Sequence, residues 1–279
     1  MHIGVSLPVR EMENDLTAIR DFAQTAEGLG LTHLRIPDQI MRPGRGYLHE
    51  PMMLLSYLAA ITTTIELVPS VIILPVRQTV HFAKQAAELD TLSGGRVRLG
   101  IGVGESEEEY QYLNMDFSNR GKRCDEQMLL LKKLWTEEDI HFQGDFHTIS
   151  GACLNPLPQQ RPIPMWIGGR SIPSKPVVKR IAQHSDGWFV LCSPKDLGQV
   201  RDAVFTEAEK LGRQPEEFGQ EAGVAVVGPR EHEWKSRVSN WHSMGLTHLC
   251  LRTLGGNLSS PEHLTTLERV IKELPVDAT

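Results

Sequence analysis

Short apolar runs alternate with amphipathic segments along the whole chain. The runs are rich in branched residues, which is typical of strands that are buried on both faces. They lie at residues 3–8, 33–38, 65–75, 96–104, 164–169, 187–191, 222–228 and 247–255. Between them, apolar residues recur at spacings of three and four, as at Leu16, Ile19 and Phe22, which predicts helices.

The order of these elements predicts the fold class. Eight strands, each followed by a helix, predict an α/β protein with a closed (β/α)8 TIM barrel, and we assign residues 1–279 to this single domain. The last helix is expected to begin near Ser260. An open doubly wound sheet is the alternative, although its switch point usually requires a less regular series of elements.

One segment interrupts this alternation. Residues 139–161 contain Gly and Pro but no helical period, and they predict a hairpin that turns at Gly144 and Asp145. The hairpin would be an insertion between the fourth helix and the fifth strand. The hairpin is either a surface elaboration or a segment that borders the pocket. Because it follows a helix, and helices end at the bottom of the barrel, a surface elaboration is favoured.

The pentapeptide GLTHL occurs twice, at residues 30–34 and 245–249. Both copies lie where a predicted helix turns into a predicted strand, the first before strand two and the second before strand eight. A duplicated half-barrel would separate the copies by four units, whereas they are six units apart. The repeat therefore indicates one kind of helix-to-strand turn, used twice around a single barrel.

Composition excludes several classes of partner. The 279 residues carry a net charge of −6 without a long basic run, which argues against nucleic acid as a partner. Four separated cysteines give no metal-site spacing and indicate reduced thiols. The most apolar stretch, at 67–76, is about half a membrane span, and the N-terminus does not resemble a signal peptide. We expect a soluble, cytoplasmic protein with no membrane partner.

Glycines cluster at the carboxyl end of the fourth strand, the end at which barrel enzymes carry their active sites. The spacing Gly100-x-Gly102-x-Gly104 differs from the dinucleotide fingerprint, because the third glycine comes one residue early and acidic residues follow it. We therefore reject a Rossmann site. The glycines instead suggest a strand end that leaves room for a flat, bulky ligand.

A second glycine pair follows the fifth strand. Gly168 and Gly169 precede Arg170 and Ser171, and a helix is expected to start around Pro173. Backbone amides at a helix N-terminus bind phosphate, and an arginine adds a charge-assisted contact. The alternative is a tight turn with Ser171 as the N-cap of the following helix.

Four longer stretches carry a family resemblance: LSGGRVRLGIGVGESEEEY at 92–110, DFSNRGKRCDEQMLLLKKLW at 116–135, PLPQQRPIPMWIGGRS at 156–171 and SDGWFV at 185–190. They resemble the luciferase-like family of flavin and deazaflavin enzymes, which includes bacterial luciferase and oxidoreductases that use coenzyme F420. The resemblance implies a (β/α)8 barrel with an insertion before strand five. It also implies a bulge in strand three with a non-proline cis peptide against the cofactor ring, a place that Ser70 and Val71 occupy.

The resemblance implies further contacts as well. The segment at 103–105 matches one that lies along the cofactor, and the segment at 168–170 matches the phosphate loop. The residues expected to bind the cofactor are Gln39, Ser70, Val71, Val103, Gly104, Gly168, Gly169 and Arg170. Gln39 is also a departure, because sugar-phosphate dehydrogenases of the family have a catalytic histidine directly after the strand-two aspartate. This difference argues against alcohol oxidation by that route.

Three residues are candidates for proton transfer at the barrel mouth: Asp38, His49 and Glu105. The alternative for His49 is a polar residue in the loop before the second helix. The alternative for Glu105 is a solvated glutamate at a helix start, where the helix dipole favours it. We expect no metal ligands among the strand-end residues.

The function expected from the resemblance is hydride transfer between coenzyme F420 and a small organic substrate, because a deazaflavin favours two-electron hydride chemistry. The rival function is oxygenation by a monooxygenase that uses reduced FMN and O2. A third possibility is a non-catalytic flavin-binding barrel. The arginines at 42, 45, 170 and 252 are consistent with an anionic cofactor tail or substrate. Members of the family commonly form dimers, so a homodimer is expected.

Overall fold

The computed structural model describes residues 1–41, 48–169 and 171–276. Within these residues, nine parallel strands form one sheet in the order β3–β2–β1–β11–β10–β9–β8–β5–β4. The strands are β1 (His2–Ser6), β2 (His33–Ile36), β3 (Glu66–Pro69), β4 (Ile72–Ile73), β5 (Leu99–Gly102), β8 (Met165–Ile167), β9 (Gly187–Val190), β10 (Gly219–Ala225) and β11 (His248–Arg252). Strand β10 begins three residues earlier than its apolar run predicts.

Strands β3 and β4 are two parts of the third barrel strand. The sequence predicted one strand over 65–75, but β3 pairs with β2 while β4 pairs with β5. Leu67 of β3 also forms a parallel bridge to Val97, just before β5, and this bridge joins the two ends of the sheet. The predicted (β/α)8 barrel is confirmed, with its third strand in two parts. The assignment of residues 1–279 to a single domain stays a prediction.

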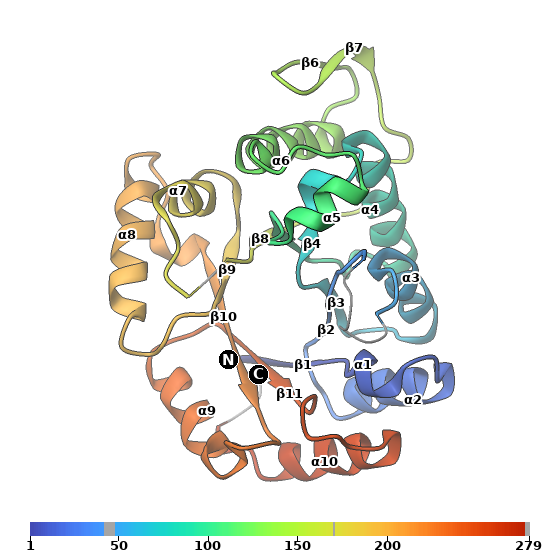
Figure 1. Ribbon diagram of the computed structural model, residues 1–279, viewed down its shortest axis with the longest axis vertical. Helices are drawn as coiled ribbons and strands as arrows, with labels where there is room; N and C mark the ends of the chain where they lie inside the picture. The colour runs from blue at the N-terminus through green and yellow to red at the C-terminus, as the bar shows by residue number, and fades with distance from the viewer. Residues whose placement is uncertain (42–47, 170, 277–279) are drawn as a thin grey trace.

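Helices surround the barrel (Figure 1), and their apolar faces bury large side chains such as Phe22, Phe82 and Trp135 against the strands. The α-helices are α1 (Val9–Met12), α2 (Leu16–Gly28), α3 (Pro51–Ile61), α4 (Thr79–Ser93), α5 (Glu107–Tyr112), α6 (Arg120–Thr136), α7 (Lys175–His184), α8 (Leu197–Glu209), α9 (Trp234–Ser243) and α10 (Ser260–Lys272), and the 3-10 turns are η1 (Leu74–Val76), η2 (Pro215–Glu217) and η3 (Glu231–Glu233). None of these helices, within the described ranges, is long and apolar enough to span a bilayer.

The hairpin predicted within 139–161 consists of the antiparallel strands β6 (Ile140–Gln143) and β7 (Thr148–Ala152), between α6 and β8 along the chain. The Glu126 carboxylate of α6 accepts hydrogen bonds from the Asp145 amide (2.6 Å) and from His147 Nδ1 (2.7 Å). In Figure 1 the hairpin projects beyond α6, away from the barrel strands. This position agrees with a surface elaboration.

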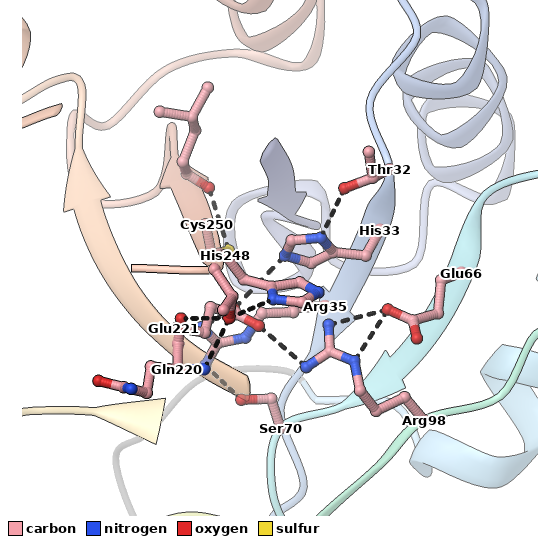
Figure 2. A network of polar contacts seen from close by, with 12 residues as sticks. Thr32, His33, Arg35, Glu66, Ser70, Arg98, Gln220, Glu221, His248 and Cys250 are labelled. Carbon is pink, nitrogen blue, oxygen red and sulfur yellow. Dashed lines mark hydrogen bonds and ion pairs between the residues drawn. The ribbon is translucent and has the colours of Figure 1, made fainter. Parts of the chain in front are cut away.

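Polar and apolar side chains alternate along the strands that line the barrel interior. In β2, Leu34 and Ile36 belong to the apolar core beneath the helices, whereas His33 and Arg35 point toward the opposite strands (Figure 2). The strands were predicted to be continuously apolar, and that prediction was wrong at these positions. A period of two is what a closed sheet requires when its two faces differ in polarity.

The two GLTHL copies adopt the same structure. Gly30 and Gly245 have φ values of +79° and +71° and directly follow the C-caps of helices α2 and α9. In each copy the threonine hydroxyl then bonds the next histidine, with Oγ1 to Nδ1 distances of 2.9 Å at Thr32 and 2.8 Å at Thr247. The repeat therefore places one histidine at the start of β2 and another at the start of β11.

The glycine at this turn provides a matched test. Gly28 and Gly30 both have open space around a Cβ, but only Gly30 has a positive φ. We expect Gly30→Ala to lower the free energy of unfolding by about 1 kcal/mol, and Gly28→Ala to leave it equal or raise it by about 0.5 kcal/mol. Chemical denaturation measures both variants. Equal effects in the two variants would contradict the proposed role of the left-handed turn.

Candidate functional site

A bulge separates β3 from β4 at the carboxyl end of the barrel. The Ser70–Val71 peptide bond is cis, as the family resemblance implied. The Ser70 amide donates to the Ile36 carbonyl of β2 (2.6 Å), and Arg35 Nη2 donates to the Ser70 hydroxyl. Both hydrogen bonds are made with residues of strand β2, which therefore positions the bulge.

The Val71 side chain lies over two glycines. A Cβ on Gly102 would lie 2.5 Å from Val71 Cγ2, and a Cβ on Gly168 would lie 2.5 Å from Val71 Cγ1. At Gly100, a Cβ would meet the Pro69 carbonyl oxygen at 2.4 Å. At Gly100 and Gly102 the space expected for a ligand is filled by the protein's own bulge, whereas cofactor binding by Gly104 and Gly168 stays a prediction. The glycines instead allow Val71 to form a platform across β5 and β8.

Asp38 connects the end of β2 to β4. Its Oδ2 accepts hydrogen bonds from the Ile73 amide and from Arg77 Nη2, both at 3.0 Å. Its Oδ1 is buried and accepts no hydrogen bond from the described residues. Burial raises the pKa of the Asp38 carboxyl, against the opposing effect of Arg77. Asp38 therefore offers one unused acceptor beside the bulge. The neighbouring Gln39 is half-buried and accepts from Arg10 Nη2 at 3.4 Å.

The segment after β5 is fixed by a tyrosine. The Tyr110 hydroxyl of α5 donates to the Val103 carbonyl at 2.6 Å, and Gly104 has a φ of +68° with Ile73 close to its missing Cβ. Glu105 is exposed and directly precedes Ser106, the N-cap of α5. The helix-start interpretation of Glu105 agrees with this position. Its catalytic role stays a prediction.

The loop after β8 differs in part from the sequence prediction. Helix α7 begins at Lys175 with Ser174 as its N-cap, rather than near Pro173 with Ser171 as the cap. The first amides of α7 thus follow Gly169 by several residues and do not begin at the glycine pair. Gly168 donates its amide to the Ile101 carbonyl of β5 at 2.8 Å. Arg170 lies outside the described residues, and the phosphate loop stays a prediction.

His49 makes a hydrogen bond outside the bulge. Its Nε2 lies 2.9 Å from the Glu13 carbonyl, in the connection that follows α1. Its chain neighbour Glu50 pairs with Arg77 at 3.0 Å, and Arg77 also binds Asp38. Direct contacts therefore connect Asp38, the bulge, Gly104 and Gly168, whereas the hydrogen bond of His49 goes to Glu13. This geometry fits the interpretation of His49 as a polar loop residue.

A buried polar network fills the barrel below the bulge (Figure 2) and was not predicted. The Glu221 carboxylate of β10 binds Arg35 Nη1 (2.7 Å) and Arg98 Nη1 (3.0 Å), and Arg98 also binds Glu66 (2.8 Å). Burial opposes ionisation of Glu221, but the charges of Arg35 and its neighbours hold its pKa well below the usual range. The alternation His33-x-Arg35 in the sequence was the signal that the prediction overlooked.

His33, Glu221 and Cys250 form the group of potential metal ligands found among the described residues, with donor atoms within 4.8 Å of one another. Two arginines already neutralise the Glu221 carboxylate. Burial raises the pKa of the Cys250 thiol to about 12, so the thiolate that binds metals is disfavoured. The local charges therefore favour a packed ion-pair network over a metal site.

A cavity of about 740 Å³ opens at the carboxyl ends of β9, β10 and β11. Arg35 and Phe189 line its inner end, and Arg252 follows from β11. Phe189 also packs with Val68, Trp166 and the partly buried Val71, in a cluster apart from the main core. The cavity and the bulge are thus adjacent. The described hairpin residues contribute no side chain to the cavity wall.

The model of the luciferase-like monooxygenase family matches residues 1–248, and the chain belongs to this family. An uncharacterised Mycobacterium tuberculosis protein, Rv0940c, is 32% identical over 198 residues, covering 64% of this chain and 67% of that protein. An F420-dependent glucose-6-phosphate dehydrogenase of Amycolatopsis mediterranei is 27% identical over 268 residues, covering 92% of this chain and 77% of that protein.

The chain is also similar to monooxygenases. An FMNH2-dependent dimethylsulfone monooxygenase of Pseudomonas putida is 28% identical over 183 residues, covering 63% of this chain and 48% of that enzyme. Among solved structures, monooxygenase RslO1 from Streptomyces bottropensis superposes with a TM-score of 0.83 at 18% identity, with 98% of each chain covered. The family thus contains oxidoreductases and monooxygenases with either cofactor.

The platform can be tested by a paired substitution. Gly102→Ala places a methyl group against Val71 Cγ2, so we expect it to destabilise the fold by about 1–3 kcal/mol. Adding Val71→Ala should restore much of this loss, because the nearest remaining atom of residue 71 is then Cβ, at 3.5 Å. Thermal and chemical denaturation measure both effects, with Gly198→Ala, which has open space, as the control. Additive losses in the double variant would contradict the contact.

The network also predicts a pH dependence of stability. Burial, then the charge of Arg98, lowers the pKa of His248 from 6.5 to about 2. Below pH 6.5 the unfolded chain binds a proton that the folded chain excludes, so the free energy of unfolding falls as the pH decreases. The expected loss approaches about 1.4 kcal/mol per pH unit for this one group.

Denaturation between pH 5 and 6.5 measures this slope, with acidic side chains still largely ionised. His248→Gln should reduce the slope, whereas His81→Gln, at an exposed position of α4, should leave it unchanged. An unaltered slope in His248→Gln would show that other groups carry the pH dependence.

Proposed function

We propose that this protein is an oxidoreductase that transfers a hydride between coenzyme F420 and a small organic substrate. The observation that carries the proposal is the Val71 platform, which lies on Gly102 and Gly168 at the carboxyl end of the barrel. It offers an apolar surface next to a cavity of a size typical for small ligands. The F420-dependent relative that matches most of the chain supports the choice of cofactor.

The residues around the platform fit a ring with polar edges. The buried Oδ1 of Asp38 lacks a hydrogen-bond partner among the described residues, and a ring N–H would supply one. Residues Gln39, Ser70, Val71, Val103, Gly104, Gly168 and Gly169 would hold the cofactor, with Arg170 at its phosphate. When bound, F420 supplies a carbon centre that accepts or donates a hydride.

The chain's own groups would position the substrate and move the proton. Asp38 has a raised pKa and a free oxygen, so it can hold a proton near the platform. Glu105, exposed at the start of α5, is the second proton-transfer candidate. Because Gln39 stands where a catalytic histidine would act in the sugar-phosphate dehydrogenases, the proposed substrate is not oxidised by that histidine route. Assembly as a homodimer is part of the proposal, by analogy with the family.

An FMN-dependent monooxygenase is the second candidate, favoured by the similarity to the dimethylsulfone enzyme. The two functions differ in the cofactor that binds to the same platform. A non-catalytic flavin-binding barrel would bind cofactor without turnover.

The first experiment titrates the apoprotein with F420, FMN and NADPH and records fluorescence quenching. We expect F420 to bind more tightly than FMN, and Gly169→Leu to weaken its binding at least about tenfold by crowding the loop after β8. Gly28→Leu, at the opposite end of the barrel with open space around its Cβ, is the matched control.

Tight binding of FMN, together with no detectable binding of F420, would replace the proposal by the monooxygenase function. Full occupancy by F420 without turnover across a panel of alcohols, aldehydes and unsaturated carbonyl compounds would favour the non-catalytic barrel. Unchanged affinity in Gly169→Leu would overturn the phosphate-loop assignment.

A further inference from the structure

One wall of the cavity is formed by arginines from three parts of the chain. Arg252 comes from the end of β11, Arg237 from α9 and Arg230 from the connection before η3. Arg230 and Arg237 come after β10, the seventh strand of the barrel, and Arg252 is the last residue of β11, the eighth strand. Many (β/α)8 enzymes bind phosphate groups in this region. The net charge of the whole protein is −6, so this wall is a local concentration of positive charge.

The charges of this wall are only partly balanced. Arg230 Nε donates to Glu233 Oε2 at 2.9 Å, but no carboxylate of the described residues forms an ion pair with Arg237 or Arg252. The pKa of Arg237 is lowered by burial and by the charges of Arg230 and Arg252, against a smaller opposing effect of the Glu233 carboxylate. Like charges that repel one another around a cavity are stabilised by an anion that binds between them.

The acidic residue in the cavity wall does not provide that anion. Glu221 is fully buried and its two oxygens are already bound by Arg35 and Arg98. Its charge therefore balances the barrel interior and forms no ion pair with Arg237 or Arg252.

A second part of the cavity wall is apolar. Phe189 and Leu191, from the end of β9, form it, and Leu191 is 56% exposed. Phe189 extends this apolar wall to the Val71 platform. A ligand that fills the cavity thus contacts arginines at one end and the platform at the other.

We propose that this cavity binds the organic substrate by an anionic group, a phosphate or carboxylate held by Arg237 and Arg252, and that the apolar body of the substrate lies along Phe189 toward Val71. Arg230 adds a third positive charge at the cavity mouth. The role of substrate site rests on the proposed function, whereas anion binding by the arginines does not.

The first test titrates the full-length protein with inorganic phosphate by calorimetry. Arg237→Gln and Arg252→Gln should each weaken phosphate binding at least about tenfold, because each removes a charge-assisted contact. Arg20→Gln, on the outer helix α2 with Asp21 as its partner, makes the same change in net charge and should leave the affinity unchanged. An equal loss in Arg20→Gln, or no loss in either cavity variant, overturns the proposal. Melting temperatures of all variants verify that they are folded.

The second test separates the substrate from the cofactor tail as the source of the anion. F420 affinity should be the same in the wild type and both cavity variants, and saturating F420 should not displace phosphate. A parallel loss of F420 affinity would assign the arginines to the cofactor and overturn the substrate site. If F420 fails to bind the wild type while phosphate binding still depends on Arg237 and Arg252, the proposed function fails and the anion site remains.

Discussion

A single buried carboxylate organises the interior of the barrel. Glu221 on β10 is shared by Arg35 on β2 and Arg98, the residue before β5, at 2.7 and 3.0 Å. An unpaired charge at this depth would carry a desolvation penalty of several kcal/mol, so the three groups are stable only as a set. From this set Arg35 reaches Ser70 in the bulge, and Arg98 reaches Glu66 at the start of β3. The course of the third barrel strand, and with it the candidate site, therefore depends on the ion pairs of Glu221.

The segments that carry the family resemblance build the frame around this network. In LSGGR, Gly94 and Gly95 have φ values of +73° and +80°, and Arg96 then donates to backbone carbonyls of the α3–β3 connection. In SDGW, Gly187 leaves room for Trp166, which would lie 2.6 Å from a Cβ at that position. These motifs identify the family because they fix the barrel. The cavity that is proposed to select the substrate lies mainly outside them, on β11 and α9.

The sequence predicted the elements well and the site only in part. Apolar spacing gave the strands and helices, since burial on one face imposes a period that local sequence displays. The cis Ser70–Val71 bond came from the resemblance, because nothing in the residues alone requires it. The glycines at 100, 102 and 104 were assigned to a ligand, whereas the atoms nearest to their missing Cβ positions belong to Pro69, Val71 and Ile73, respectively. That error was unavoidable without coordinates, because a missing side chain does not reveal which neighbour approaches.

The sequence by itself determined the order of the eight strand–helix units, the turns at Gly30 and Gly245, and the family. The tertiary structure decided which polar side chains meet. Arg35 and Glu221 are 186 residues apart, and only closure of the sheet brings them to 2.7 Å. The arginines of the cavity are likewise gathered from separate elements by the barrel. Periodicity along the chain records which face of a strand is buried, but the partner across the barrel depends on register and closure, which no local pattern contains.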